Sequence, residues 1–249
     1  MTKGRDKLKL LLLQIRESPK VRREELESFA RYCRLNINQI DVLNVFDTPD
    51  FSLNSNAGYD ALLVGGASDA NVLHPEKYRF VPRAQELLMR CVDVKQPVFA
   101  SCFGYQLAVL ALGGEIIHDG DIYEMGTIPI SLTEDAGRDL VFQGVPDGFM
   151  AVSVHKQKSV TVPPNTISLA HTAVCNHSFK VINSPFWAFQ FHPEVDKRIL
   201  IERLTFYKEH YTNDDGHLDS VLSVAQETPE ANDLCARFID HVLLGLDPS

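Results

Sequence analysis

The sequence has no cluster of basic residues. Its 249 residues include 24 Lys and Arg against 33 Asp and Glu, which gives a formal net charge of −9 at pH 7. Binding to nucleic acid or to an anionic membrane requires grouped Lys and Arg that neutralise phosphates, whereas the basic residues here are scattered. We therefore expect neither nucleic acid nor a membrane among the partners.

Long apolar segments are also missing. The apolar run near the N-terminus is too short for a signal peptide and lacks a small-residue cleavage site. No window approaches the roughly 20 apolar residues of a membrane span. We expect a soluble, cytoplasmic protein. Low-complexity tracts and obvious repeats are absent, and the length allows one large core or two small ones.

The cysteines form no C-x-x-C pair, and their number is odd. The five are widely spaced: Cys33, Cys91, Cys102, Cys175 and Cys235. This usage fits a reducing compartment better than a disulfide framework or a zinc site, so each cysteine can be judged on its own.

What the sequence does contain is a regular alternation of short apolar runs and longer helical patterns. Strands are predicted at residues 8–15, 39–46, 59–66 and 97–101, with helices at 19–35 and about 81–94. Strands buried on both faces and joined through helices are typical of a parallel sheet. We expect an α/β fold, a flavodoxin-like three-layer sandwich with a central, mostly parallel sheet and flanking helices.

After Gly114 the pattern changes to shorter strands and turns. Residues 115–133 and 148–163 are predicted to form strands with turns, and residues 178–195 a hairpin turning at 183–185. These strands predict a small antiparallel extension of the sheet. Helices are predicted at 195–211 and 228–246, separated by a polar linker at 212–220. The last helix is expected to pack on the outside of the domain, with partner docking as the second interpretation.

A cysteine lies at a strand-to-helix junction. The stretch Ala100-Ser101-Cys102-Phe103-Gly104 has small residues two before and two after the cysteine, which is typical of a nucleophile elbow with Cys in place of Ser. A helix N-terminus lowers a thiol pKa, and the Phe103 amide is available to stabilise an oxyanion. The alternative interpretation is a buried cysteine that only fills space, and the elbow pattern alone does not separate the two.

A thiol nucleophile needs a base, and the base needs an orienting group. In WAFQFHPEV, His192 directly follows an apolar strand and Glu194 lies two residues beyond it. At the sheet edge that carries ligands in α/β folds, His192 can face Cys102 while Glu194 holds its other ring nitrogen. By itself, His192 would also fit a structural histidine at a strand end.

Together these motifs resemble the class I (triad) glutamine amidotransferases. SCFGYQLAVLALGGE is similar to the nucleophile motif of that family, FQFHPEV to its base motif, and VGGAS at 64–68 to its glycine turn. The resemblance runs from about Leu8 to Leu204. Within the family, the chain is most similar to stand-alone domains like the amidotransferase part of GMP synthase.

The resemblance implies a role for each matched residue. Cys102 would be the nucleophile, His192 the general base and acid, and Glu194 the orienting carboxylate. Gly66 and Phe103 would supply the oxyanion hole. Substrate-binding positions would be Gly65, Gln106 and His155. The implied reaction hydrolyses the side-chain amide of glutamine through a γ-glutamyl thioester and needs no metal or other cofactor.

The chain departs from the family pattern in several places. Tyr105 replaces the usual His or Gln, the proline after the paired glycines is missing, and Gln157 stands where an acidic residue is frequent. His155 is therefore expected to be structural or close to the substrate rather than catalytic. Cys175 is expected to be a packing residue.

We expect residues 1–212 to form an amidotransferase-like domain and 213–249 a C-terminal helical extension without an assigned role. No segment is long enough for a second catalytic domain that would use the ammonia. Three alternatives stay open: a separate synthase or synthetase chain, a stand-alone hydrolase of glutamine or a γ-glutamyl peptide, and a silent binding or scaffold protein. A homodimer is also compatible. Flavodoxin-like peptidases and stress proteins are a more remote alternative. Their histidine closely follows the cysteine, whereas Phe103 follows Cys102 here and the candidate histidine is His192.

Overall fold

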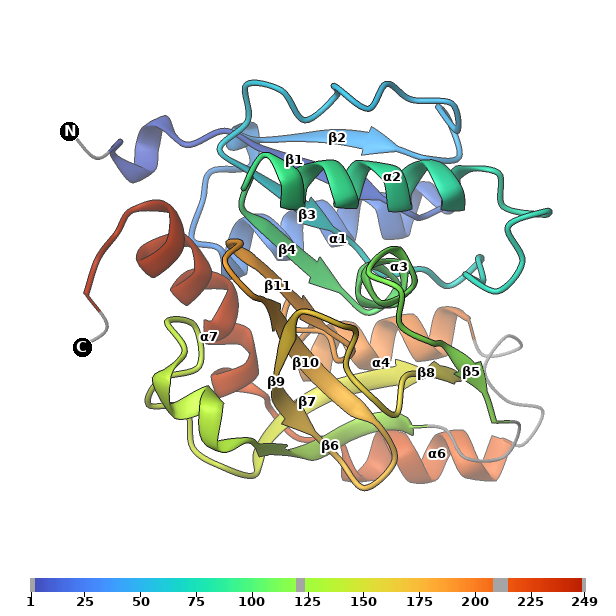
Figure 1. The fold of residues 1–249 in the computed structure, drawn as a ribbon. Helices are drawn as coiled ribbons and strands as arrows, with labels where there is room; N and C mark the ends of the chain where they lie inside the picture. Colours follow the sequence, from blue (N-terminus) through green and yellow to red (C-terminus); the bar gives the residue numbers. More distant parts are fainter. Residues whose placement is uncertain (1–2, 120–123, 208–214, 248–249) are drawn as a thin grey trace.

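The protein was analysed as a computed structural model that describes residues 3–119, 124–207 and 215–247. Its centre is a nine-stranded mixed sheet (Figure 1). In spatial order the strands are β2 (Ile40–Asn44), β1 (Leu10–Gln14), β3 (Ala61–Val64), β4 (Val98–Ser101), β11 (Phe186–Phe189), β10 (Asn176–Val181), β9 (Thr166–His171), β6 (Glu124–Leu132) and β7 (Phe149–His155).

One half of the sheet is parallel and the other half antiparallel. The pairs from β2 through β1, β3 and β4 to β11 are all parallel, and those from β11 through β10, β9 and β6 to β7 are all antiparallel. The turn at 183–185 joins β10 to β11 as the sequence predicts, with Asn183 at φ 59°. A separate two-stranded sheet pairs β5 (Ile117–His118) with β8 (Gln157–Lys158).

Helices cover both faces of the parallel half. Leu10 and Leu12 of β1 pack into one apolar cluster with α1 (Pro19–Tyr32) and α7 (Pro229–Arg237). Leu11 and Leu13 pack into the opposite cluster with α2 (Phe80–Asp93) and α3 (Phe103–Ala111). This alternation follows from the period of two along a strand. In Figure 1, α2 and α3 lie in front of the sheet and α1 behind it. The predicted three-layer α/β sandwich is confirmed.

The C-terminal region corrects one prediction. Residues 215–220, expected to be polar linker, belong to the helix α6 (Asp215–Val224), while 212–214 lie outside the described residues. Leu218, Val221, Leu222 and Ala225 recur at helical spacing and pack against α4 (Lys197–Phe206) and β7. Polar residues precede these apolar positions, so the local pattern predicts a linker where the structure has a helix.

The last helix penetrates the core rather than only covering it. Buried residues of α7 include Ala231, Leu234 and Cys235, and a π-helical continuation at Phe238–Leu243 adds Phe238 to the same cluster. Phe238 packs edge-on against Phe99 of β4, with ring centroids 5.3 Å apart. The expected boundary between residues 212 and 213 lies outside the described residues.

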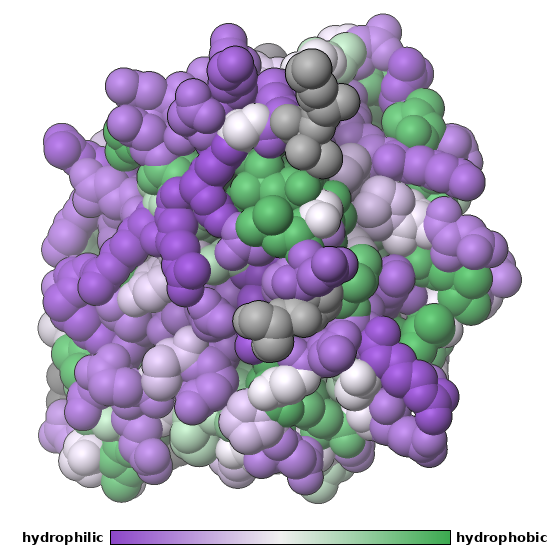
Figure 2. All heavy atoms as spheres, turned by 90° about the vertical axis from the view of Figure 1, so that its left-hand side faces the viewer, coloured by the Kyte–Doolittle hydropathy of each residue, from purple (hydrophilic) through white to green (hydrophobic). Residues whose placement is uncertain are grey.

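The described residues contain no helix long and apolar enough to span a bilayer. Figure 2 views the molecule from the side of the two chain ends. The surface there is mainly hydrophilic, with hydrophobic residues in separate patches.

A substitution of Gly104, in the first turn of α3, tests how closely that helix packs on β3. A Cβ at Gly104 would lie 2.9 Å from Cβ of Val64 and 3.0 Å from its carbonyl oxygen. We expect Gly104→Ala to lower the free energy of unfolding by about 1–3 kcal/mol, because the backbone of β3 cannot move aside. Urea denaturation measures this. Gly137→Ala is the control, since nothing lies within 4 Å of its new Cβ, and an equal effect of the two substitutions would contradict the argument.

Candidate active site

Cys102 occupies a strained turn between β4 and α3. Its backbone has φ 49° and ψ −95°, a region that non-glycine residues rarely adopt. Its amide donates to the carbonyl oxygen of Phe189 at 2.7 Å, which extends the parallel pairing of β4 and β11 into the turn. The side chain is buried at the N-terminus of α3, with Sγ 3.9 Å from the carbonyl oxygen of Val154. The predicted elbow geometry is present.

His192 and Glu194 lie beside this turn. They follow β11, the strand next to β4, so the two parallel strands bring the cysteine and the histidine to the same sheet edge. Nδ1 of His192 lies 2.7 Å from Oε1 of Glu194 and 3.5 Å from the hydroxyl of Ser101, the residue before Cys102. The His192 amide donates to the carbonyl oxygen of Val152 on β7, which fixes the backbone of the base. The structure thus brings together the three residues that the sequence singled out.

The charges of these side chains depend on one another. Burial lowers the pKa of His192, but the negative charges of Cys102 and Glu194, and hydrogen bonds to both, outweigh burial and raise it to about 9. Burial raises the pKa of Glu194, yet the His192 charge and hydrogen bond, with Arg203 and Ser101, lower it to about 2. The raised pKa of His192 and the lowered pKa of Glu194 favour an imidazolium–carboxylate pair beside the Cys102 turn.

The glycine turn after β3 lies against His192. A Cβ on Gly66 would stand 2.7 Å from Cε1 of His192 and 2.8 Å from Nη2 of Arg16, so a larger residue there would displace one of these side chains. The amide of Phe103, the first residue of α3, has no partner within the helix. Gly66 thus lies against His192, and Phe103 directly follows Cys102 in the chain.

The other expected pocket residues have different surroundings. Gln106 is buried, and Nε2 of its side chain donates to the carbonyl oxygen of Gln157 at 3.0 Å and to Oε1 of Gln190 at 3.4 Å. The amide of Gly65 donates to Leu13 in the β1–β3 pairing. His155 is buried, with Nε2 2.9 Å from a Glu124 carboxylate oxygen.

Three polar residues near the triad were not predicted from the sequence. Ser101 donates its hydroxyl to Oε2 of Glu194 at 2.7 Å, and Nε2 of Gln190 lies 3.9 Å from Sγ of Cys102. Arg16 forms a buried ion pair with Glu25 at 2.8 Å and directs Nη2 toward Gly66. Ser101 and Gln190 adjoin the two motifs, which is a signal that could have found them. Arg16 follows the first strand and carries no such signal.

The C-terminal helix holds the turn that carries Glu194. Nδ2 of the buried Asn232 donates to the carbonyl oxygens of Pro193 and Val195, at 2.8 and 3.0 Å. These two carbonyls flank Glu194, so α7 fixes the backbone on both sides of the carboxylate.

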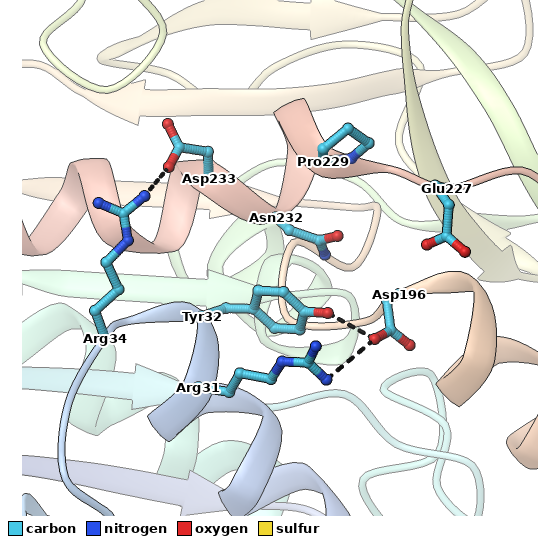
Figure 3. Close-up of a pocket in the computed structure, with 8 residues that line it drawn as sticks. All are labelled: Arg31, Tyr32, Arg34, Asp196, Glu227, Pro229, Asn232 and Asp233. Carbon is cyan, nitrogen blue, oxygen red and sulfur yellow. Dashed lines mark hydrogen bonds and ion pairs between the residues drawn. The ribbon is translucent and has the colours of Figure 1, made fainter.

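A surface cavity of about 630 Å³ opens on the other side of Asn232 (Figure 3). Its lining includes Tyr32 and Arg31 of α1, which bind Asp196 at 2.6 and 3.6 Å. Arg34 and Asp233 form an ion pair at its rim. Neither Cys102 nor His192 lines this cavity, so it is distinct from the candidate active site.

The fold and site define a class of protein. The family model described as glutamine amidotransferase class-I matches residues 27–207, which is more than half of the chain. The chain belongs to the class I glutamine amidotransferase family.

Individual relatives point to two different activities. The chain is 27% identical over 150 residues to a glutamine-hydrolysing GMP synthase subunit of Methanocaldococcus jannaschii, covering 59% of this chain and 71% of that protein. It is 26% identical over 172 residues to gamma-glutamyl peptidase 3 of Arabidopsis thaliana, covering 66% of each. The crystal structure of a glutamine amidotransferase from Thermotoga maritima aligns with a TM-score of 0.73 over 95% of this chain and 98% of that one. At 18% identity, this likeness shows the fold alone.

The charge coupling in the site predicts a titration. We expect His192 in the wild type to titrate near pH 9, and Cys102→Ala to lower this pKa because the interaction with the Cys102 side chain, which raises it, is lost. NMR of the imidazole as a function of pH measures it. Cys91→Ala is the matched control, since burial raises the pKa of that thiol to about 12 and keeps it neutral. An unchanged His192 pKa in Cys102→Ala would disprove the coupling.

The contact between α7 and the Glu194 turn predicts a loss of stability. Asn232→Ala removes the amide that donates to the Pro193 and Val195 carbonyls and leaves Val195 only the longer contact with the Thr228 hydroxyl at 3.5 Å. We expect it to lower the free energy of unfolding by about 1–3 kcal/mol. Asp233→Asn, at the neighbouring, more exposed position, is the control. Urea denaturation of both variants measures the difference, and equal effects would argue against the contact.

Proposed function

We propose that the chain hydrolyses the side-chain amide of glutamine and releases ammonia. The observation that carries this proposal is the placement of the buried His192–Glu194 pair beside the Cys102 turn, with Nδ1 of His192 2.7 Å from Glu194 and 3.5 Å from the Ser101 hydroxyl. The roles are those expected from the sequence: Cys102 as nucleophile, His192 as base and acid, and Glu194 as the orienting carboxylate.

The first step forms a thioester. The Cys102 thiolate attacks the amide carbon of glutamine, and the carbonyl oxygen becomes an oxyanion bound by the amides of Gly66 and Phe103. As the carbon–nitrogen bond breaks, the nitrogen takes the proton of His192 and leaves as ammonia.

In the second step, neutral His192 takes a proton from water while the water oxygen attacks the thioester carbon. The carbon–sulfur bond breaks, the product leaves as a carboxylic acid that loses its proton to solvent to become glutamate, and the thiolate–imidazolium pair is restored. Ser101 and Glu194 hold the His192 ring in one orientation through both steps.

Gln106 is proposed to position the amino acid end of the substrate, because it is linked through Gln190 to Cys102. His155 and Gly65 are proposed to contribute to substrate binding by holding the backbone that lines the pocket. The side chain of His155 is buried, and the amide of Gly65 is engaged by Leu13. Residues 213–249 are proposed to be an extension that completes the domain, since Asn232 holds the Glu194 turn.

For the fate of ammonia, we propose delivery to a separate synthase or synthetase chain. The match to a protein named as one glutamine-hydrolysing subunit of GMP synthase supports this arrangement. The match to a gamma-glutamyl peptidase supports a second candidate, hydrolysis of a γ-glutamyl peptide by the chain alone. A cytoplasmic location would suit either candidate.

The proposal is tested by labelling and by turnover. We expect a glutamine-analogue electrophile, diazo-oxo-norleucine, to add once to the wild type and not to Cys102→Ala, as seen by intact-mass spectrometry. Cys91→Ala, which removes another buried cysteine, should still be labelled. Labelling of Cys102→Ala, or no labelling of the wild type, would refute the assignment and favour a binding or scaffold protein.

Rates then separate the two candidates. We expect Cys102→Ala to lower glutamate release by about 10⁴-fold or more, since a triad acts as a unit. If ammonia is passed to a partner chain, glutaminase activity of the isolated protein should be low and γ-glutamyl peptides should not be hydrolysed. Rapid hydrolysis of such peptides by the chain alone would instead establish the peptidase candidate.

A further inference from the structure

Four buried side chains with metal-binding atoms meet at one end of the antiparallel half of the sheet. The group, called here the Glu124 cluster, consists of Glu124, His155, Cys175 and His177. One ligand atom from each lies within 4.8 Å of all the others. Glu124 on β6 and His155 on β7 are directly paired across the strands, while Cys175 and His177 come from the start of β10. None of the four belongs to the proposed triad.

The contacts of the cluster include more hydrogen-bond acceptors than two neutral imidazole rings can donate to. Oε2 of Glu124 lies 2.9 Å from Nε2 of His155 and 2.7 Å from Nε2 of His177. Nδ1 of His155 lies 3.0 Å from the carbonyl oxygen of Gln157, which can only accept. A neutral imidazole carries one proton, so His155 can donate to only one of its two acceptors. A cation between Nε2 of His155 and the carboxylate would replace the missing proton.

The surroundings orient the ligand atoms as in metal sites. A histidine that binds a metal through one ring nitrogen commonly donates from the other to a carbonyl oxygen, as Nδ1 of His155 can to Gln157. The second carboxylate oxygen of Glu124 accepts from the Thr172 hydroxyl at 2.8 Å. Nδ1 of His177 is buried without a partner in the described part of the chain, so Nε2 alone anchors that ring in the cluster.

We propose that the Glu124 cluster is a zinc site. One thiolate, one carboxylate and two neutral imidazoles are typical zinc ligands, and their two negative charges balance Zn²⁺ in a buried place. Bonds of about 2.0–2.3 Å in a tetrahedron place ligand atoms about 3.3–3.8 Å apart. Sγ of Cys175 is 3.4 Å from Nε2 of His177 and 3.9 Å from Oε2 of Glu124, while the shorter nitrogen–oxygen contacts must open.

Four protein ligands leave no open position, so the zinc is structural. It ties β6, β7 and β10 together one residue from Val154, whose carbonyl oxygen contacts Cys102. From the sequence, Cys175 was expected to be a packing residue and no metal was expected. Cys175 is buried as expected, but its neighbours are polar. The site is hidden in the sequence because its ligands are spread over residues 124–177.

The experiment adds Zn²⁺ to chelator-treated full-length protein and counts bound metal by native mass spectrometry. We expect about one zinc per chain in the wild type and less than about a tenth of that in the Cys175→Ser, His177→Gln double variant, which lacks two ligands. Cys102→Ala is the matched control because it removes another buried thiol beside a histidine. It should keep its zinc, even if the proposed glutaminase function fails.

Cobalt binding to the wild type provides a readout that needs no ligand variant. Co²⁺ in the wild type should give the sulfur-to-metal charge-transfer absorption of a cysteine ligand, and this band should persist in Cys102→Ala. Thr172→Val should weaken zinc binding by about 10- to 100-fold, since it removes the hydroxyl that orients Glu124. Absence of zinc and of the cobalt band in the wild type would overturn the proposal. So would loss of either one in Cys102→Ala.

Discussion

The parallel pairing of β4 with β3 on one side and β11 on the other is the constraint on which the candidate site depends. Parallel neighbours end at the same sheet edge, so the glycine turn, Cys102 and His192 converge there although they lie far apart in the sequence. The amide of Cys102 continues the pairing with Phe189, which holds the turn in its strained conformation. This convergence requires small residues at two positions. A Cβ on Gly66 would collide with His192, and one on Gly104 with Val64.

Burial makes the charges of the site interdependent. Glu194 is completely buried, and its two carboxylate oxygens bind His192 and Ser101. Removing one partner of such a group leaves a charge that neither water nor protein compensates. The opposed pKa shifts of His192 and Glu194 express this dependence. Two further ion pairs compensate buried charge: Arg16 pairs with the buried Glu25 of α1, and Arg203 of α4 pairs with the partly buried Glu24.

Segments outside the recognisable motifs hold the motifs in place. Asn232 of α7 binds the carbonyls on both sides of Glu194, and the backbone of β7 binds the amide of His192. The antiparallel half of the sheet therefore does more than extend the core, since β7 also contributes the Val154 carbonyl next to Cys102. The family match ends at residue 207, yet the helix that follows at 229–237 packs into the main core and contacts the Glu194 turn.

The sequence by itself determined the alternation of strands and helices, the elbow at Cys102 and the pairing of its motif with FQFHPEV. These features are local: apolar runs, helical spacing and small residues beside a strained turn are visible within a few positions. Local pattern failed at 215–220, where the polar start of α6 hid the apolar residues that follow it. Only the tertiary structure decided the contacts of Ser101 with Glu194, of Asn232 with the adjoining carbonyls, and of Glu124 with His155 and His177. Each joins residues tens of positions apart, and the order in which strands pair in space, rather than the order of the chain, sets which of them meet.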